Sequence, residues 1–153
     1  MDLVEYKIAT REDIDNLIES RLEMLRVVNN LDDDYVFSED FIKESREYFL
    51  NGNHITVFAI SDGKIIGCAS MCFIYIMPTF SHPTGKRAHL MNVYTNTEYR
   101  RQGIGRKMTM MLIDLAWERG ATEISLDATE SGRMLYKACG FTDSDECMVL
   151  TRE

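Results

Sequence analysis

The order of apolar and polar residues in the first third of the chain predicts one strand and two helices. Residues 3–9 alternate between the two kinds, as in a strand. Thr10, with Asp13 three residues later, has the pattern of a helix N-cap. Ser38 is a second candidate N-cap, and its helix is expected to stop at residues 51–52. The first helix carries apolar side chains every three or four positions: Ile14, Leu17, Ile18, Leu22 and Leu25.

The middle of the chain predicts a hairpin and a further strand. Residues 54–61 and 64–76 are rich in β-branched and aromatic residues, and Asp62-Gly63 between them is a strong type I′ turn signal. Residues 77–86 contain both prolines of the chain and are expected to form a loop. Residues 88–95 are expected to form the next strand.

The last third of the chain predicts two helices and two strands. Apolar residues from Ile104 to Leu115 recur at helical spacing, and Gly120 is expected to end this helix. Core packing explains its methionines better than a soft-metal site does. We expect the remaining elements to be a strand at residues 124–128, a short helix at 131–138 and a final strand at 146–152.

These elements follow the order β-α-α-β-β-β-α-β-α-β. We expect an α/β (α+β) fold with a mixed, mostly antiparallel sheet flanked by helices. The chain shows no internal repeat and no linker composition. A single domain over residues 1–153 is therefore predicted.

Composition narrows the classes of function. The formal net charge of −8 at pH 7 argues against a nucleic-acid-binding surface and is compatible with a cationic partner such as an amine. The longest uncharged stretch, residues 65–81, is shorter than the ~20 apolar residues of a membrane span. Acidic residues stand where a secretory signal would be basic. We therefore expect a cytoplasmic protein with no membrane partner.

The four cysteines are expected to be buried free thiols. They lie in or beside apolar segments, no CxxC motif occurs, and the three histidines lack zinc-ligand spacing. The sequence therefore predicts no metal site.

Residues 98–107, EYRRQGIGRK, concentrate positive charge on an otherwise acidic chain. They lie between a predicted strand and a predicted helix, where free backbone N–H groups and the helix dipole form an anion site. Gly103 and Gly105 leave room for an anion and permit positive φ angles. Neither a GxGxxG nor a Walker A spacing is present. The segment is either a different kind of phosphate-binding loop or a tight turn whose basic residues face solvent.

A second segment, SGRMLYKACGF at residues 131–141, contains a short predicted helix. Leu135 and Ala138 can pack inward on this helix, and Gly140 is expected to end it. Tyr136 lies in its middle, where a lone tyrosine more often packs than takes part in chemistry. A chemical role for Tyr136 becomes the better interpretation only when it is considered together with the phosphate loop.

The two segments together resemble the GNAT superfamily of acyl-CoA-dependent N-acyltransferases, as does the order of elements over nearly the whole chain. The family's R/Q-x-x-G-x-G/A motif matches RRQGIG at residues 100–105. Its small-x-x-Leu-Tyr-x-x-x-Gly-Phe motif matches GRMLYKACGF at residues 132–141. The resemblance therefore implies an N-acetyltransferase domain that uses acetyl-CoA as its donor, without a metal.

The resemblance also implies roles for particular residues. The basic loop would hold the pyrophosphate of coenzyme A, and a bulged strand would pair with the pantetheine arm and polarise the thioester carbonyl. Tyr136 would be the general acid that protonates the leaving thiolate. The cofactor-binding residues implied are Val93, Tyr94, Thr95, Arg100, Arg101, Gln102, Gly103, Ile104, Gly105, Arg106 and Thr129.

The chain departs from the family pattern at two positions. Thr97 stands where proline is common, which has little bearing on function. Thr129 stands where asparagine often helps to position the cofactor, and only its hydroxyl is available for that hydrogen bond.

A general base is also expected, because a primary amine of pKa about 10.4 is neutral in only roughly one molecule in two thousand at pH 7. His89 lies on the strand that would hold the thioester, where histone-acetylating members of the family carry a base glutamate. Glu23 and Asp127 are the rival candidates, and a structural histidine is the alternative for His89. The acidic residues 32–34 either attract a cationic acceptor or are simply solvated.

On these grounds we expect direct transfer of acetyl from acetyl-CoA to a primary amine. Cys139 has no histidine near it in sequence, which disfavours a covalent acyl-enzyme. The acceptor is a small amine, an antibiotic, or a protein lysine or N-terminus, and the resemblance is compatible with a homodimer. The alternatives are a non-catalytic acyl-CoA-binding sensor and a pure interaction domain.

Overall fold

The computed structural model describes residues 3–152 and contains one five-stranded sheet with the order β1-β2-β3-β4-β5. The first four strands pair antiparallel with their neighbours, and β5 pairs parallel with β4. The predicted mixed, mostly antiparallel sheet is therefore confirmed. The strands are β1 (Val4–Ile8), β2 (His54–Ser61), β3 (Lys64–Tyr75), β4 (Lys86–Thr95) and β5 (Ile124–Leu126).

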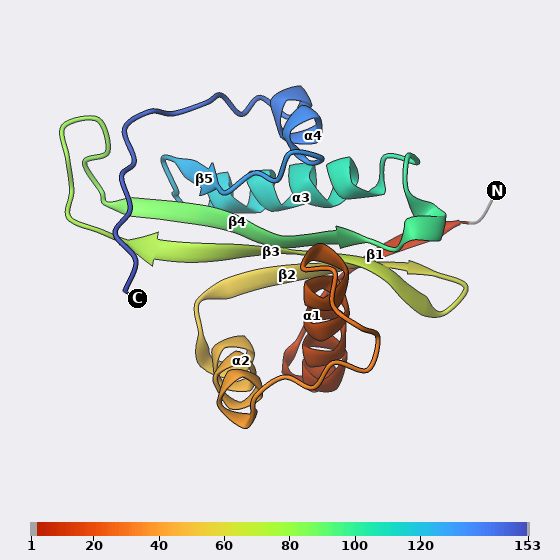
Figure 1. Cartoon of the computed structure of the whole chain (residues 1–153). Helices are drawn as coiled ribbons and strands as arrows, with labels where there is room; N and C mark the ends of the chain where they lie inside the picture. The colour runs from red at the N-terminus through yellow and green to blue at the C-terminus, as the bar shows by residue number, and fades with distance from the viewer. Residues whose placement is uncertain (1–2, 153) are drawn as a thin grey trace.

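Helices cover both faces of the sheet, as Figure 1 shows. On one face lie α1 (Ile14–Val28), which follows the short 3-10 helix η1 (Arg11–Asp13), and α2 (Glu39–Asn51). On the other face lie α3 (Ile104–Glu118), which follows η2 (Thr97–Tyr99), and α4 (Arg133–Ala138). No helix within residues 3–152 is long and apolar enough to cross a membrane.

Local signals in the sequence account for where the first elements begin and turn. The Thr10 backbone N–H donates to the Asp13 carboxylate at 2.8 Å, and the Ser38 hydroxyl accepts from the Phe41 N–H at 3.1 Å. Asp62 and Gly63 have φ angles of 51° and 75°, which is the backbone of a type I′ turn. These three predicted caps and turns are confirmed.

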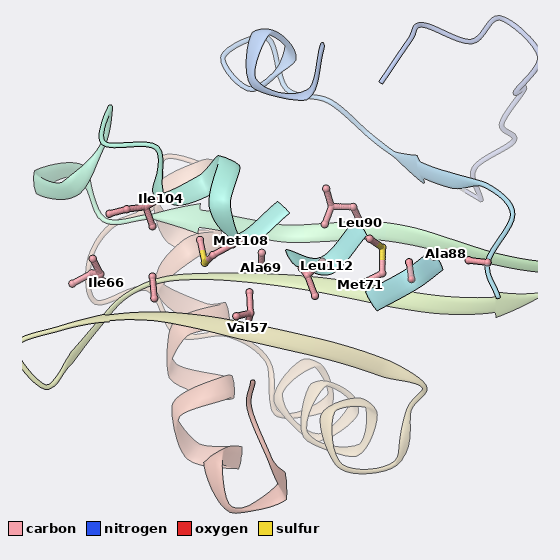
Figure 2. Packing of buried hydrophobic residues seen from close by; sticks show 12 residues of the cluster. Val57, Ile66, Ala69, Met71, Ala88, Leu90, Ile104, Met108 and Leu112 are labelled. Carbon is pink, nitrogen blue, oxygen red and sulfur yellow. The ribbon is translucent and has the colours of Figure 1, made fainter. Parts of the chain in front are cut away.

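The main core lies between α3 and the sheet. Met108 and Leu112 of α3 are fully buried against Val57, Ala69 and Met71 of β2 and β3 (Figure 2). A methionine packs well in such a site because its unbranched side chain fits irregular gaps. No cluster of metal-ligating side chains occurs among residues 3–152.

A second, smaller core lies under α1. Leu17 and Met24 pack there with Phe58, Cys68 and Tyr94 of the sheet. Tyr94 therefore faces α1, whereas Leu90, four residues earlier on the same strand, belongs to the core under α3. Since residues four apart on a regular strand share a face, β4 must change its alternation between them.

Three predictions about the C-terminal part were wrong. No strand forms at residues 146–152, where Met148, Val149 and Leu150 are exposed. The preceding strand is limited to Ile124–Leu126, so it offers little edge for another strand to pair with. Ala138 is exposed, because the half-buried side of α4 consists of residues 132, 135, 136 and 139.

Candidate active site

A bulge in β4 is the first feature of the candidate site. Cys68 pairs with Tyr94 and Ser70 with Met91, so that Asn92 and Val93 both oppose the single residue Ala69. Asn92 has a φ of 62°, in the left-handed region. This bulge reverses which face of the sheet successive β4 side chains point to, and it takes Asn92 and Val93 out of the regular hydrogen-bond ladder with β3. Such a bulge is what the resemblance to the GNAT superfamily implies.

The same strand has an open edge. Its parallel pairing with β5 ends where Leu90 meets Leu126, and residues 91–95 have no partner on that side within residues 3–152. The backbone groups on that edge are free to pair with an extended ligand, in the way an added strand would. The open edge includes Val93, Tyr94 and Thr95, the three residues expected to pair with pantetheine.

The basic loop leads from this edge into the start of α3. Arg101 and Gly103 have φ angles of 65° and 79°, and Gly103 is the N-cap of the helix. The Lys107 N–H donates to the Gly103 carbonyl, so the N–H groups of residues 104–106 before it have no acceptor within the helix. Nothing lies within 4 Å of where a Cβ of Gly103 would be. The loop is therefore an open anion site at a helix N-terminus.

The side chains of the loop divide into structural and free ones. Arg100 donates from Nε to the Thr95 carbonyl at 3.0 Å, and its guanidinium lies 5.9 Å from the centre of the Tyr94 ring. It therefore fixes the loop to β4. Ile104 is buried in the core, so only its backbone can reach a ligand. Arg101, Gln102 and Arg106 are exposed and can contact an anion.

The three parts of the site meet at Gly105. A Cβ there would lie 3.5 Å from Leu135 Cδ2 and 3.7 Å from Thr95 Oγ1. The start of α3, the end of the open β4 edge and α4 are therefore in contact at one point. Tyr136 follows Leu135 on α4, so its helix is held beside the open edge.

Close packing holds the Tyr136 ring. The ring contacts Phe141 edge-on with 6.0 Å between centroids, and a Cβ at Gly132 would lie 3.0 Å from a ring carbon. Burial, and secondarily the nearby Cys139 thiol, raise the pKa of the Tyr136 hydroxyl, so it keeps its proton at neutral pH. Thr129 caps this turn, because its hydroxyl accepts from the Gly132 N–H at 3.2 Å.

His89 projects onto the face of the sheet that α1 and α2 cover, since its neighbours Ala88 and Leu90 belong to the core under α3. Its Nδ1 is 2.7 Å from Ser125 Oγ, and its Nε2 is 3.6 Å from Asp127 Oδ2. The side chain is 24% exposed. A partly exposed imidazole beside a carboxylate can accept a proton and hold it.

Of the two other base candidates, only Asp127 lies beside His89. Glu23 is exposed on α1 and lines a small cavity with Cys68 and Tyr94, on the side of the bulge toward the basic loop. Asp127 is fully exposed and is the partner of His89. Burial raises the pKa of the Cys139 thiol, which disfavours the thiolate that a covalent acyl-enzyme would need.

Asn92 was missed by the sequence analysis. It is buried within β4, and its side chain is hydrogen-bonded to Arg21 and Ser70. A signal for it was present, because asparagine is depleted in strands and tolerates positive φ. The contact with Arg21 spans 71 positions of sequence and had no local signal.

Comparison with known proteins is consistent with this geometry. The sequence pattern of the Acetyltransferase (GNAT) family matches residues 18–141. A solved structure of a predicted acetyltransferase with acetyl-CoA from Clostridium acetobutylicum superposes with a TM-score of 0.86 at 31% identity, covering 97% of this chain and 96% of that one.

Two curated relatives align over shorter stretches. Glucosamine 6-phosphate N-acetyltransferase 1 of Dictyostelium discoideum is 28% identical over 65% of this chain and 59% of its own length. Thialysine N-epsilon-acetyltransferase of Bos taurus is 35% identical over 44% of this chain and 42% of its own length. The alignments thus span less than two thirds of each relative.

Proposed function

Because the chain belongs to the acetyltransferase (GNAT) family, we propose that it transfers an acetyl group from acetyl-CoA to the primary amine of a small molecule. The observation that carries this proposal is the meeting of three features at Gly105: the open β4 edge, the free N-terminus of α3 and the helix that bears Tyr136. In this proposal the first two features bind the donor, and the third supplies the general acid.

The open edge and the loop form the donor site in this proposal. The N–H groups of residues 104–106, with Arg101 and Arg106 beside them, bind the pyrophosphate. The backbone of residues 93–95 pairs with the pantetheine arm. Gln102 and the hydroxyl of Thr129 are polar groups within the same region, and the Thr129 O–H can still donate while its oxygen accepts from Gly132.

The bulge and Tyr136 act on the thioester. Acetyl-CoA supplies an activated acetyl group whose carbonyl oxygen gains negative charge during transfer. A backbone N–H released by the bulge donates a hydrogen bond to that oxygen. The Tyr136 hydroxyl, which is protonated at neutral pH, gives its proton to the departing thiolate.

His89 is the base in this proposal, because of its position along β4. If the pyrophosphate lies at the loop and pantetheine runs back along residues 95–93, the acetyl group points toward the N-terminal end of the strand. His89 lies three residues beyond Asn92, roughly 10 Å along the strand, on the face opposite α3. With its Nε2 proton facing Asp127, Nδ1 accepts from the Ser125 hydroxyl, and this hydroxyl can pass its proton to Nδ1 while it takes up a proton from the amine through water.

The named substrates of the relatives support a small acceptor. One relative is named for glucosamine 6-phosphate and another for thialysine, and both compounds are small molecules with a primary amine. We therefore favour a small-molecule amine over a protein lysine.

The test is an acetyl-transfer assay with a panel of amines that includes glucosamine 6-phosphate, thialysine, an aminoglycoside and a lysine peptide. Product mass should rise by one acetyl group for at least one small amine. The His89→Gln variant should lower kcat for that amine and leave the Kd for acetyl-CoA unchanged. Tight binding of acetyl-CoA with no transfer to any amine would instead indicate a non-catalytic acyl-CoA sensor.

A further inference from the structure

A chain of side-chain hydrogen bonds crosses the sheet beneath α1 and α2 and ends at the β4 bulge. Arg21 Nη1 lies 3.3 Å from Asn92 Oδ1, and Asn92 Nδ2 lies 3.2 Å from Ser70 Oγ. Ser70 Oγ is 2.7 Å from Thr56 Oγ1, which is 3.1 Å from His54 Nδ1. His54 Nε2 is 2.9 Å from the carbonyl oxygen of residue 49, in the last turn of α2. The chain thus joins both helices to the bulge.

One set of directions lets each buried hydroxyl of this chain both accept and donate. An arginine can only donate and a carbonyl can only accept, so Arg21 donates to Asn92 and His54 Nε2 donates to the carbonyl of residue 49. Asn92 then donates to Ser70, Ser70 donates to Thr56, and Thr56 donates to His54 Nδ1. If Thr56 donated to Ser70 instead, the buried Ser70 hydroxyl proton would have no acceptor within the chain. We therefore expect His54 to carry its proton on Nε2 and to accept at Nδ1.

The residue at the end of the chain is the one whose backbone needs support. Asn92 has a φ of 62°, which asparagine tolerates better than most residues but which interrupts the regular strand. Its side chain is held at both ends, by Arg21 and Ser70, and its carbonyl accepts from the Cys68 thiol at 3.4 Å. These contacts fix the orientation of the peptide groups at the bulge.

We infer that Ser70 and Thr56 are positioning residues for acyl transfer, because they hold the Asn92 side chain and through it the bulge. The inference rests on the proposed function for its kinetic consequence. Neither residue touches the donor: Thr56 and Ser70 are 1% and 4% exposed, on the face opposite α3. Their loss should therefore change the rate of transfer more than the binding of acetyl-CoA.

Thr56 and Ser70 each have a matched control in this chain. Thr109 and Ser61 are equally buried, and their hydroxyls have no hydrogen-bond partner within residues 3–152. Thr109→Val and Ser61→Ala therefore remove a hydroxyl of the same kind without breaking the chain. Thr56→Ser keeps the hydroxyl and serves as the rescue variant for Thr56→Val.

The kinetic experiment compares these variants by kcat and by the KM for acetyl-CoA. Ser70→Ala and Thr56→Val should lower kcat by about ten- to hundredfold, the effect expected of a misplaced catalytic group, and change KM less than threefold. Thr56→Ser and both controls should keep the wild-type kcat. The inference is wrong if the chain-breaking variants match their controls.

An NMR experiment tests the same inference without activity. Long-range proton–nitrogen spectra at pH 7 should show His54 with its proton on Nε2. Ser70→Ala should shift the backbone amide resonances of Asn92 and Val93, whereas Ser61→Ala should leave them in place. An Nδ1 proton on His54, or unchanged Asn92 and Val93 resonances in Ser70→Ala, would overturn the inference. If the wild-type protein transfers no acetyl group, the proposed function fails. The NMR measurements then decide on their own whether Ser70 and Thr56 hold the bulge.

Discussion

Gly103 and Gly63 form a matched pair that separates a backbone effect from an effect on binding. Gly103 starts α3 with a φ of 79°, and Gly63 lies in the β2–β3 turn with a φ of 75°. A Cβ at either position would meet no atom within 4 Å. Gly103→Ala and Gly63→Ala should therefore cause nearly the same backbone strain at two different places in the fold.

The change in stability should be the same for both variants. Each places an L side chain in the left-handed region, which costs ~1–2 kcal/mol of unfolding free energy. Only Gly103→Ala also adds a methyl group to the loop proposed to bind the pyrophosphate. If one charge-assisted hydrogen bond to the pyrophosphate is lost, ~1.5–3 kcal/mol of binding free energy goes with it. The Kd for coenzyme A should then rise roughly ten- to hundredfold.

Urea unfolding followed by circular dichroism measures the first effect, and isothermal titration with coenzyme A measures the second. Gly63→Ala should bind coenzyme A as wild type does, despite its lower stability. The reasoning is refuted if Gly103→Ala binds with the wild-type Kd, or if both variants lose affinity together.

Three further predictions concern the acid, the core and the thiols. Tyr136→Phe should lower kcat on the order of 10²-fold with little change in the Kd for acetyl-CoA, and an unchanged kcat would exclude Tyr136 as the acid. Leu112→Ala, at a fully buried position, should lower the unfolding free energy by ~2–5 kcal/mol. Met110→Ala, on the exposed side of α3, should change the unfolding free energy by less than about 0.5 kcal/mol. Equal losses of stability in the two variants would contradict the described core. Burial raises the pKa of the Cys68 thiol to about 12. At pH 8, iodoacetamide should therefore modify the exposed Cys147 and leave Cys68 intact in the folded protein, as peptide mass spectrometry would show. Equal rates of modification at the two cysteines would contradict the burial of Cys68.

Features set by neighbouring residues could be predicted from the sequence. The caps at Thr10 and Ser38 and the turn at Asp62-Gly63 each depend on residues within three or four positions. The basic loop was also recognisable, because its glycines and arginines lie within one short segment. Its placement at the start of α3 is confirmed by the structure.

Features set by distant contacts could not be predicted in this way. The final strand at residues 146–152 had the right composition, but a strand also needs an edge to pair with, and β5 has only three residues. The position of His89 on its strand was enough to make it a candidate base. Its contact with Ser125 could not be predicted, because Ser125 lies 36 positions further along the chain. The chain from Arg21 to His54 joins two helices and three strands, and only the folded sheet brings its members together.

An NMR titration of the 15N-labelled protein with coenzyme A tests the proposed donor site most directly. We expect the largest amide shifts on residues 93–95 of the open β4 edge and on residues 103–106 at the start of α3. Shifts confined to other surfaces, or no shifts at millimolar coenzyme A, would contradict the proposed donor site and with it the proposed acetyltransferase.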